Sequence, residues 1–158
     1  MRLLTAILLW CLASGTADGS RRRYNCPARF VRISNGCYLF STTMETWQDA
    51  FFACRAAGAD LAAMETGWED SNIRSYLNRP ELAHLERWIG GIYNWITRRW
   101  VWGSDGHHLL YQGFSRVSLT ANHKWHCIIM DPIKFYKWST RLCTVKKHYI
   151  CETFLMTV

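Results

Sequence analysis

No apolar run in the 158-residue sequence is long enough to cross a bilayer. The run at the N-terminus, residues 3–13, has about half of the roughly 20 apolar residues that a membrane-spanning helix needs. It follows the basic Arg2 and precedes small residues, with Gly15 and Ala17 at the positions of a cleavage pair. This order predicts a signal peptide over residues 1–17 and a secreted, extracellular protein without a membrane span.

Motifs for catalysis and for structural zinc are also missing. The sequence has no Gly-x-Ser-x-Gly or His-Glu-x-x-His motif, no glycine-rich phosphate loop and no Cys-x-x-Cys pair. We therefore expect neither an enzyme nor a cysteine-bound zinc ion. The chain has no Asn-x-Ser/Thr sequon, so N-linked glycans are not expected on it.

Six cysteines remain once Cys11 is removed with the signal peptide. They are Cys26, Cys37, Cys54, Cys127, Cys143 and Cys151. An even number in an exported chain predicts three disulfides, and six cysteines can pair in fifteen ways. Cys26 and Cys37 flank the turn signal Asn35-Gly36 and are close enough in sequence to close that hairpin locally. Spacing alone does not select among the pairings.

Positive charge exceeds negative charge in the chain. The formal net charge is +7, and it falls to +6 when Arg2 leaves with the signal peptide. Such a balance favours anionic partners, namely sulfated or sialylated glycans, acidic proteins or anionic surfaces, although it equally serves to keep a secreted protein soluble. Nucleic acid is not an expected partner.

The remaining residues predict one α+β domain with two short flanking segments. Residues 18–25 form a basic arm that includes Arg21, Arg22 and Arg23, and we interpret this arm as a solvated terminus. Residues 26–152 form the domain, and residues 153–158 form a C-terminal tail.

Two capping boxes predict the starts of two helices. Thr42 with Glu45 precedes a helix that ends at Gly58, and Thr66 with Glu69 precedes a second helix. The buried stripe of the first helix is expected to comprise Met44, Trp47, Phe51 and Cys54. The charges expected on the solvated face of the second helix are Glu69, Asp70 and Arg74.

Short apolar and aromatic runs predict strands near residues 61–64, 88–93, 100–102, 127–130 and 149–151. Between Gly103 and Trp125 small, polar and apolar residues mix without a period. This pattern predicts a long loop, and long loops in compact domains often carry function.

The chain carries a series of cysteine and aromatic markers in order. They are Cys37-Tyr38 with Phe40, Trp47, Cys54, Leu61-Ala62, Trp88-Ile89-Gly90, Trp100, Trp102, Cys127, Trp138, Cys143 and Tyr149-Ile150-Cys151-Glu152. In this order they resemble a C-type lectin-like domain over residues 26–152, and the layout is similar to perlucin-like secreted lectins. The resemblance implies two helices flanking short antiparallel sheets, with a long loop region. It also implies the long form of the domain, in which Cys26 pairs with Cys37, Cys54 with Cys151 and Cys127 with Cys143.

Sugar binding in this family usually runs through a calcium ion. The ion is held by a Glu-Pro-Asn or Gln-Pro-Asp motif in the long loop and by a Trp-Asn-Asp motif near the end of the domain, because calcium needs about six to eight oxygen ligands. Here Ser139 and Thr140 follow Trp138, and the loop position falls at Ser118, Leu119 and Thr120. Residues 106–130 contain no Asp or Glu. We therefore expect no calcium at the usual sugar site and no other cofactor.

Histidines of the long loop are the other candidate metal ligands. They are His107, His108, His123 and His126. Residues 106–130 supply no carboxylate or free thiolate beside them, so we favour an ordinary polar loop over a zinc or copper site.

A basic and aromatic set near the C-terminus is the predicted ligand-binding surface. It comprises Lys134, Tyr136, Lys137, Arg141, Lys146 and Lys147. Aromatic faces stack on sugar rings and cations pair with sulfate or carboxylate, so the leading hypothesis is calcium-independent recognition of glycans, anionic polysaccharides included. The alternatives are a protein-interaction module, acting also as a homodimer through exchange of the long loop, and a matrix or mineral-associated protein.

Overall fold

The computed structural model describes residues 24–115 and 123–157. Its helices are α1 (Trp47–Ala56), α2 (Gly67–Leu77) and a short 3-10 helix, η1 (Pro132–Lys134). Its strands are β1 (Tyr24–Asn25), β2 (Val31–Ile33), β3 (Gly36–Phe40), β4 (Asp60–Leu61), β5 (Arg87–Asn94), β6 (Arg99–Trp102), β7 (His126–Asp131), β8 (Lys137–Leu142), β9 (His148–Phe154) and β10 (Met156–Thr157). The predicted signal peptide and loop positions 118–120 lie outside the described residues.

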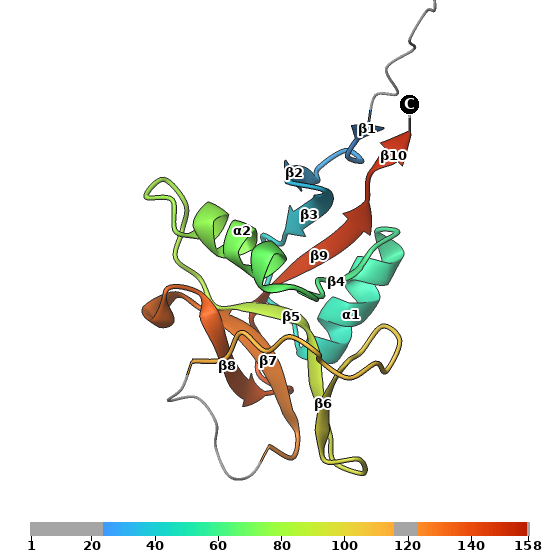
Figure 1. Ribbon diagram of the computed structural model, residues 1–158, viewed down its shortest axis with the longest axis vertical. Helices are drawn as coiled ribbons and strands as arrows, with labels where there is room; N and C mark the ends of the chain where they lie inside the picture. The colour runs from blue at the N-terminus through green and yellow to red at the C-terminus, as the bar shows by residue number, and fades with distance from the viewer. Residues whose placement is uncertain (1–23, 116–122, 158) are drawn as a thin grey trace, which may run out of the picture.

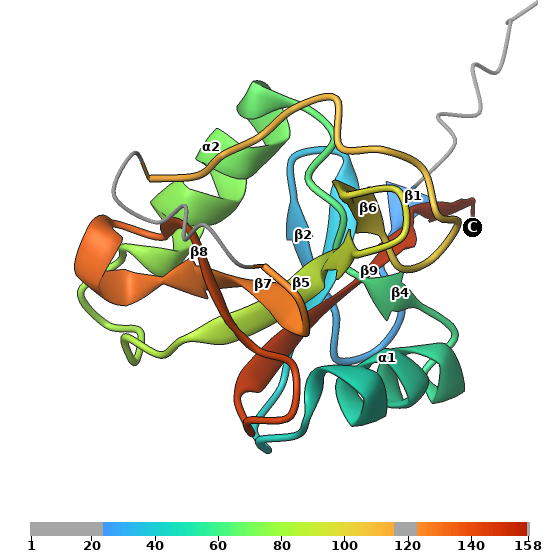
Figure 2. The ribbon, with the colours of Figure 1, turned by 90° about the horizontal axis from the view of Figure 1, so that it is seen from below.

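The sheet runs in the order β2-β3-β9-β5-β7-β8, with β4 also paired to β9 and β6 to β5. Neighbouring strands are antiparallel except for β5 and β9, which run parallel. The predicted α+β class is confirmed, and the sheet is mixed rather than wholly antiparallel. The two helices lie on opposite sides of the central strands (Figure 1, Figure 2). Neither helix of the described chain combines the length and apolar character needed to pass through a bilayer.

Each helix covers its own hydrophobic cluster. On one side of the sheet, Ile73 and Leu77 of α2 pack with a group that includes Trp138. On the other side, Trp47 and Cys54 of α1 pack with a second group. Burial of large apolar side chains is the main driving force for folding, so these two clusters fix the positions of the helices on the sheet.

The first helix begins later than the sequence predicts. Its N-cap is Thr46, whose hydroxyl accepts a hydrogen bond from Asp49 N at 3.2 Å, so the capping box at Thr42 and Glu45 was the wrong choice. Met44 consequently lies before the helix and is 54% exposed. The second capping box is confirmed, because the Thr66 hydroxyl accepts from Glu69 N.

Replacement of Thr46 by alanine is expected to lower the free energy of unfolding by about 1 kcal/mol, since it leaves an amide at the start of α1 without its acceptor. The same change at the exposed Thr42 is expected to cost less than about 0.5 kcal/mol. Urea denaturation of the two variants measures the difference. Equal losses would show that Thr46 does not cap α1.

All three disulfide pairings implied by the resemblance are confirmed. Cys26 is bonded to Cys37, Cys54 to Cys151 and Cys127 to Cys143. The second bond joins residues 97 apart in sequence and ties α1 to β9.

The two ends of the described chain meet in a small separate sheet. β1 pairs antiparallel with β10, with Asn25 opposite Met156. Parts of the predicted arm and of the predicted tail are therefore strands. This pair lies at one end of the long axis, and the turn between β5 and β6 lies near the other end (Figure 1).

Candidate functional site

Trp138 anchors the described part of the long loop to β8. Its ring makes edge-to-face contacts with Tyr111 and Phe114, and its backbone N–H donates to Gly113 O at 2.9 Å. A side chain at Gly113 would come within 2.9 Å of the indole, so only glycine permits this close approach without movement. The loop up to residue 115 is thus packed on the core.

Asp70 lies beneath this contact and is 1% exposed, so its prediction as a solvated residue was wrong. One carboxylate oxygen accepts from Trp138 Nε1 at 2.8 Å, and the other accepts from the Tyr111 hydroxyl at 3.0 Å. Burial raises the pKa of Asp70, whereas these two hydrogen bonds and Arg74 oppose that rise. Burial, together with the same carboxylate, raises the pKa of Tyr111 to about 12.

The residues at the usual calcium positions do not fit a calcium ion. Ser139 is buried, and its hydroxyl donates to Asp131 Oδ2 at 2.9 Å and accepts from Lys134 Nζ at 3.0 Å. Thr140 is also buried. Neither residue supplies a carboxylate, and the ammonium group beside Ser139 repels a divalent cation. Positions 118, 119 and 120 lie outside the described residues.

The predicted basic surface does not form one cationic face. Tyr136 is 0% exposed, so its prediction as a ligand-binding residue was wrong. Arg141 and Lys147 both pair with Glu86. The remaining pairs are Lys134 with Asp131 at 3.7 Å and Lys146 with Glu45 at 3.7 Å. Lys137 is exposed on β8. Carboxylates therefore offset most of this charge.

The inward position of Tyr136 has a backbone cause. Phe135 and Tyr136 both have positive φ values, 52° and 58°, which place the chain after η1 in the left-handed region. Residues other than glycine seldom adopt this conformation, so sequence does not predict it. The turn exposes Phe135 and buries Tyr136.

An exposed aromatic group lies at the end of the molecule formed by the β5–β6 turn and residues 123–126, which we call the long-loop end. Trp95 in the turn is 54% exposed and Trp125 is 63% exposed. Lys124 Nζ lies 5.6 Å from the ring centre of Trp95 and 5.5 Å from that of Trp125. We call these three residues the tryptophan–lysine platform. The sequence signal that indicates this platform is the presence of tryptophan in turn segments, where residues are usually polar.

Two arginines lie in the same hairpin as Trp95. Arg98 and Arg99 are exposed, and together with His108 they line a hollow of about 440 Å³. Within the described ranges no carboxylate lies within ion-pair distance of either arginine. Positive charge is therefore less compensated here than on β8.

The histidines of the long loop do not gather into one group of metal ligands within the described ranges. His123 packs on Tyr93 and Trp100, and burial lowers its pKa. His107 forms an exposed ion pair with Asp105. Among the residues that the structure places, no group of three or more histidine, cysteine, aspartate or glutamate side chains could hold a metal ion.

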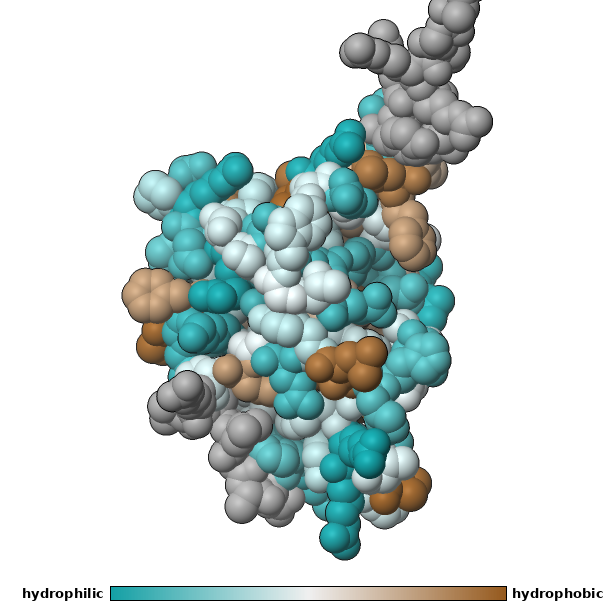
Figure 3. Space-filling model, in the orientation of Figure 1, coloured by the Kyte–Doolittle hydropathy of each residue, from teal (hydrophilic) through white to brown (hydrophobic). Residues whose placement is uncertain are grey.

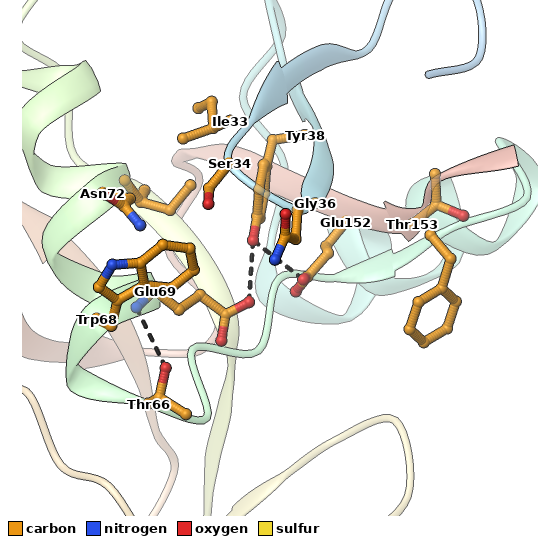
Figure 4. Close-up of a pocket in the computed structure, with 13 residues that line it drawn as sticks. Ile33, Ser34, Gly36, Tyr38, Thr66, Trp68, Glu69, Asn72, Glu152 and Thr153 are labelled. Atoms are coloured by element: carbon orange, nitrogen blue, oxygen red, sulfur yellow. Dashed lines mark hydrogen bonds between the residues drawn. The ribbon is translucent and has the colours of Figure 1, made fainter. Parts of the chain in front are cut away.

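A second hollow, of about 340 Å³, lies between α2 and the β2–β3 turn (Figure 4). In it the Tyr38 hydroxyl lies 3.0 Å from Glu69 Oε1 and 3.1 Å from Glu152 Oε1. A phenol has one proton, so both contacts are hydrogen bonds only when one carboxyl is protonated. Burial, aided by the charge of Glu69, raises the pKa of Glu152 to about 8. With its pKa raised to about 8, Glu152 is the carboxyl that carries the proton at neutral pH.

The change Glu152→Gln is expected to flatten the pH dependence of stability. Because the folded pKa of about 8 exceeds the ordinary value of 4.5, the folded chain binds more protons between these values. Its free energy of unfolding therefore falls as pH rises from about 4.5 to about 8. Glutamine imitates the protonated acid, so the variant should exceed the original chain in stability at pH 9 by at least about 1 kcal/mol.

Urea denaturation between pH 4 and pH 9 measures this effect. The matched control is Glu65→Gln, which removes an exposed carboxylate just before α2 and should leave the slope unchanged. A parallel pH profile for the original chain and Glu152→Gln would show that Glu152 is ionised in the folded protein.

Comparison with known proteins assigns the class of the protein. The family described as Lectin C-type domain matches residues 43–153, and the chain belongs to this family. The chain is 26% identical to the galactose-specific lectin nattectin of Thalassophryne nattereri, over 93% of each chain. It is 24% identical to a perlucin-like protein of Mytilus galloprovincialis, over 80% of this chain and 82% of that one.

A solved structure with the same fold is the Ca²⁺-independent C-type lectin SPL-2 of Saxidomus purpuratus. It superposes with a TM-score of 0.72 and 25% identity, over 81% of this chain and 93% of that chain. The fold and the family are therefore established, and the relatives named here are lectins or lectin-like proteins rather than enzymes.

Proposed function

We propose that this chain is a secreted lectin that binds anionic glycans without calcium through its long-loop end. The observation that carries the proposal is the contact between Lys134 Nζ and Ser139 Oγ at 3.0 Å. This contact puts a positive charge of the protein beside a position where this family usually holds calcium. A sugar must therefore be bound without help from a calcium ion at that position. The likeness to the Ca²⁺-independent lectin SPL-2 supports this proposal.

The charge of the long-loop end supports an anionic ligand. Arg98, Arg99 and Lys124 lie there, and residues 106–130 contain no Asp or Glu. Cations attract sulfate or carboxylate groups, and that attraction weakens as salt is added. We propose this site in place of the predicted basic and aromatic set near the C-terminus, whose cations are mostly paired.

A glycan array of the purified mature protein, in calcium and in EDTA, tests the proposal. We expect binding to sulfated and carboxylated glycans that is equal in both buffers and declines with added salt. Binding that disappears in EDTA would contradict the proposal, because it would reveal a calcium site involving the loop. Mass spectrometry of the secreted chain should show cleavage near residue 17.

A protein ligand is the second candidate, and one observation favours it. Ile133 and Phe135 of the η1 region are 84% and 72% exposed, and exposed apolar side chains often mark protein contacts. On the face shown in Figure 3, however, the coloured hydrophobic side chains are scattered rather than joined into one patch. Binding that is insensitive to salt and lost in Phe135→Ser would favour this candidate over a glycan.

A further inference from the structure

We infer that the second hollow, between α2 and the β2–β3 turn, is a further binding site that takes one uncharged sugar ring without calcium. The site is separate from the long-loop end, so the inference does not rest on the proposed function. Its volume of about 340 Å³ is near the lower limit of about 300 Å³ for small-ligand pockets, which suits a ligand with a single ring.

An amide donor without an acceptor belongs to the wall that α2 contributes. Asn72 Nδ2 is buried and has no hydrogen-bond acceptor among the described residues. In Figure 4 Asn72 faces Ser34 and Tyr38 across the hollow. A buried donor without an acceptor is costly, so a ligand that brings an oxygen atom to this nitrogen removes that cost.

Acceptors come from Glu69 and Glu152, which both contact the Tyr38 hydroxyl. Glu69 Oε2 accepts from Glu65 N at 2.9 Å, and Glu152 Oε2 accepts from Ala63 N at 3.0 Å. Because a carboxylate oxygen has two lone pairs, these oxygens can each accept one more hydrogen bond. The hydroxyl groups of a sugar both donate and accept, so one ring can serve the carboxyl groups and the amide donor together.

An exposed aromatic ring stands beside the donor. Trp68 lines the hollow, is 60% exposed and precedes Asn72 by four positions in α2. Residues four apart are neighbours on a helix surface, as are residues three apart such as Glu69 and Asn72. A sugar ring whose C–H face stacks on the indole therefore has its hydroxyl groups near both a donor and an acceptor.

The walls of the hollow are held in place before any ligand binds. Tyr38 lies opposite Glu152 in the pairing of β3 with β9, and the Thr66 hydroxyl caps the first turn of α2 at Glu69 N. A side chain at Gly36 would come within 2.6 Å of the Tyr38 hydroxyl, so glycine is what lets the turn lie against this ring. Preorganised walls reduce the entropy that is lost on binding.

The charge of the hollow disfavours both kinds of ion. The described residues that line it include no lysine or arginine, so the negative charge of Glu69 repels an anion. Burial raises the pKa of Glu152 to about 8, which lowers the attraction for a cation at neutral pH. An amine also offers only donors and would leave Asn72 Nδ2 without an acceptor.

Saturation-transfer NMR in EDTA at pH 7 tests the inference with the methyl glycosides of galactose, mannose, glucose and N-acetylglucosamine. We expect at least one of them to bind, and Asn72→Ala and Trp68→Ala to weaken that binding by about tenfold or more. Gln48→Ala is the amide control and Phe52→Ala the ring control, because both residues are exposed on α1. Neither control should change the affinity.

Thermal melting separates a loss of binding from a loss of folding. Asn72→Ala removes a buried donor that has no acceptor in the described chain, so its melting temperature should equal or exceed that of the original chain. This variant keeps the test valid if Trp68→Ala is destabilised. The inference is wrong if none of the four sugars binds or if Asn72→Ala binds as well as the original chain. Binding of tetramethylammonium but of no sugar would also overturn it, because the carboxyl groups would then form a cation site. None of these results bears on anionic glycans at the long-loop end.

Discussion

Replacement of both Cys54 and Cys151 by serine is expected to lower the free energy of unfolding by about 4–5 kcal/mol. The bond closes a loop of 97 residues, and the entropy that a cross-link removes from the unfolded chain grows with loop length. Domains of this size are typically stable by about 5–15 kcal/mol, so the loss is a large share of the total. The variant should unfold at much lower urea concentration and be secreted poorly.

The matched control is the double change of Cys26 and Cys37 to serine. That bond closes a segment of 11 residues, so its removal should cost about 2 kcal/mol less than removal of the long-range bond. Replacing both partners avoids a free thiol in either variant. Equal losses of unfolding free energy in the two variants would show that the stabilisation does not depend on the length of the loop that each bond closes.

Replacement of Asp70 by alanine is expected to cost about 2–4 kcal/mol. The change removes the acceptor of both Trp138 Nε1 and the Tyr111 hydroxyl, and a buried donor without an acceptor costs about 1–3 kcal/mol. The segment of the long loop that rests on Trp138 should loosen as well. Urea denaturation measures the stability, and near-UV circular dichroism should report the altered surroundings of the tryptophan.

Two variants refine this result. Asp70→Asn retains one acceptor oxygen and should lose less than Asp70→Ala. Arg74→Gln removes a partly exposed ion-pair partner at 3.8 Å, together with an exposed hydrogen bond to Phe135 O, and should cost less than about 1 kcal/mol. A loss for Asp70→Ala no larger than that for Arg74→Gln would mean that the two buried hydrogen bonds contribute little.

The features that the sequence predicts well are those with strong covalent or periodic signals. The six cysteines and the spaced tryptophans carry the family resemblance, and that resemblance implied the fold class and the disulfide pairings that the structure has. Asp70 was misplaced although a signal existed: it is three residues before Ile73 and seven before Leu77, which puts it on the buried face of α2. The charge of the carboxylate favours a solvated position, whereas the helical period places it on the buried face.

The site was harder to predict because it depends on rare backbone conformations and on contacts between distant segments. The positive φ values of Trp125, Phe135 and Tyr136 decide which ring faces outward, and no local propensity encodes them. Glu86 offsets the charge of Arg141 and Lys147 from more than 50 positions away. Sequence proximity therefore suggested a basic surface that the fold largely neutralises.

The pairing of β1 with β10 determines which end of this lectin faces outward when the chain is attached to a surface. Because both ends of the described chain lie at one end of the long axis, an attachment at either terminus leaves the long-loop end facing away from the support (Figure 1). Coupling through either end is therefore equivalent for binding assays on a surface. Fusion to an oligomerising segment would display several outward-facing long-loop ends at once, and such multivalency strengthens attachment to a repeating polymer without any new contact.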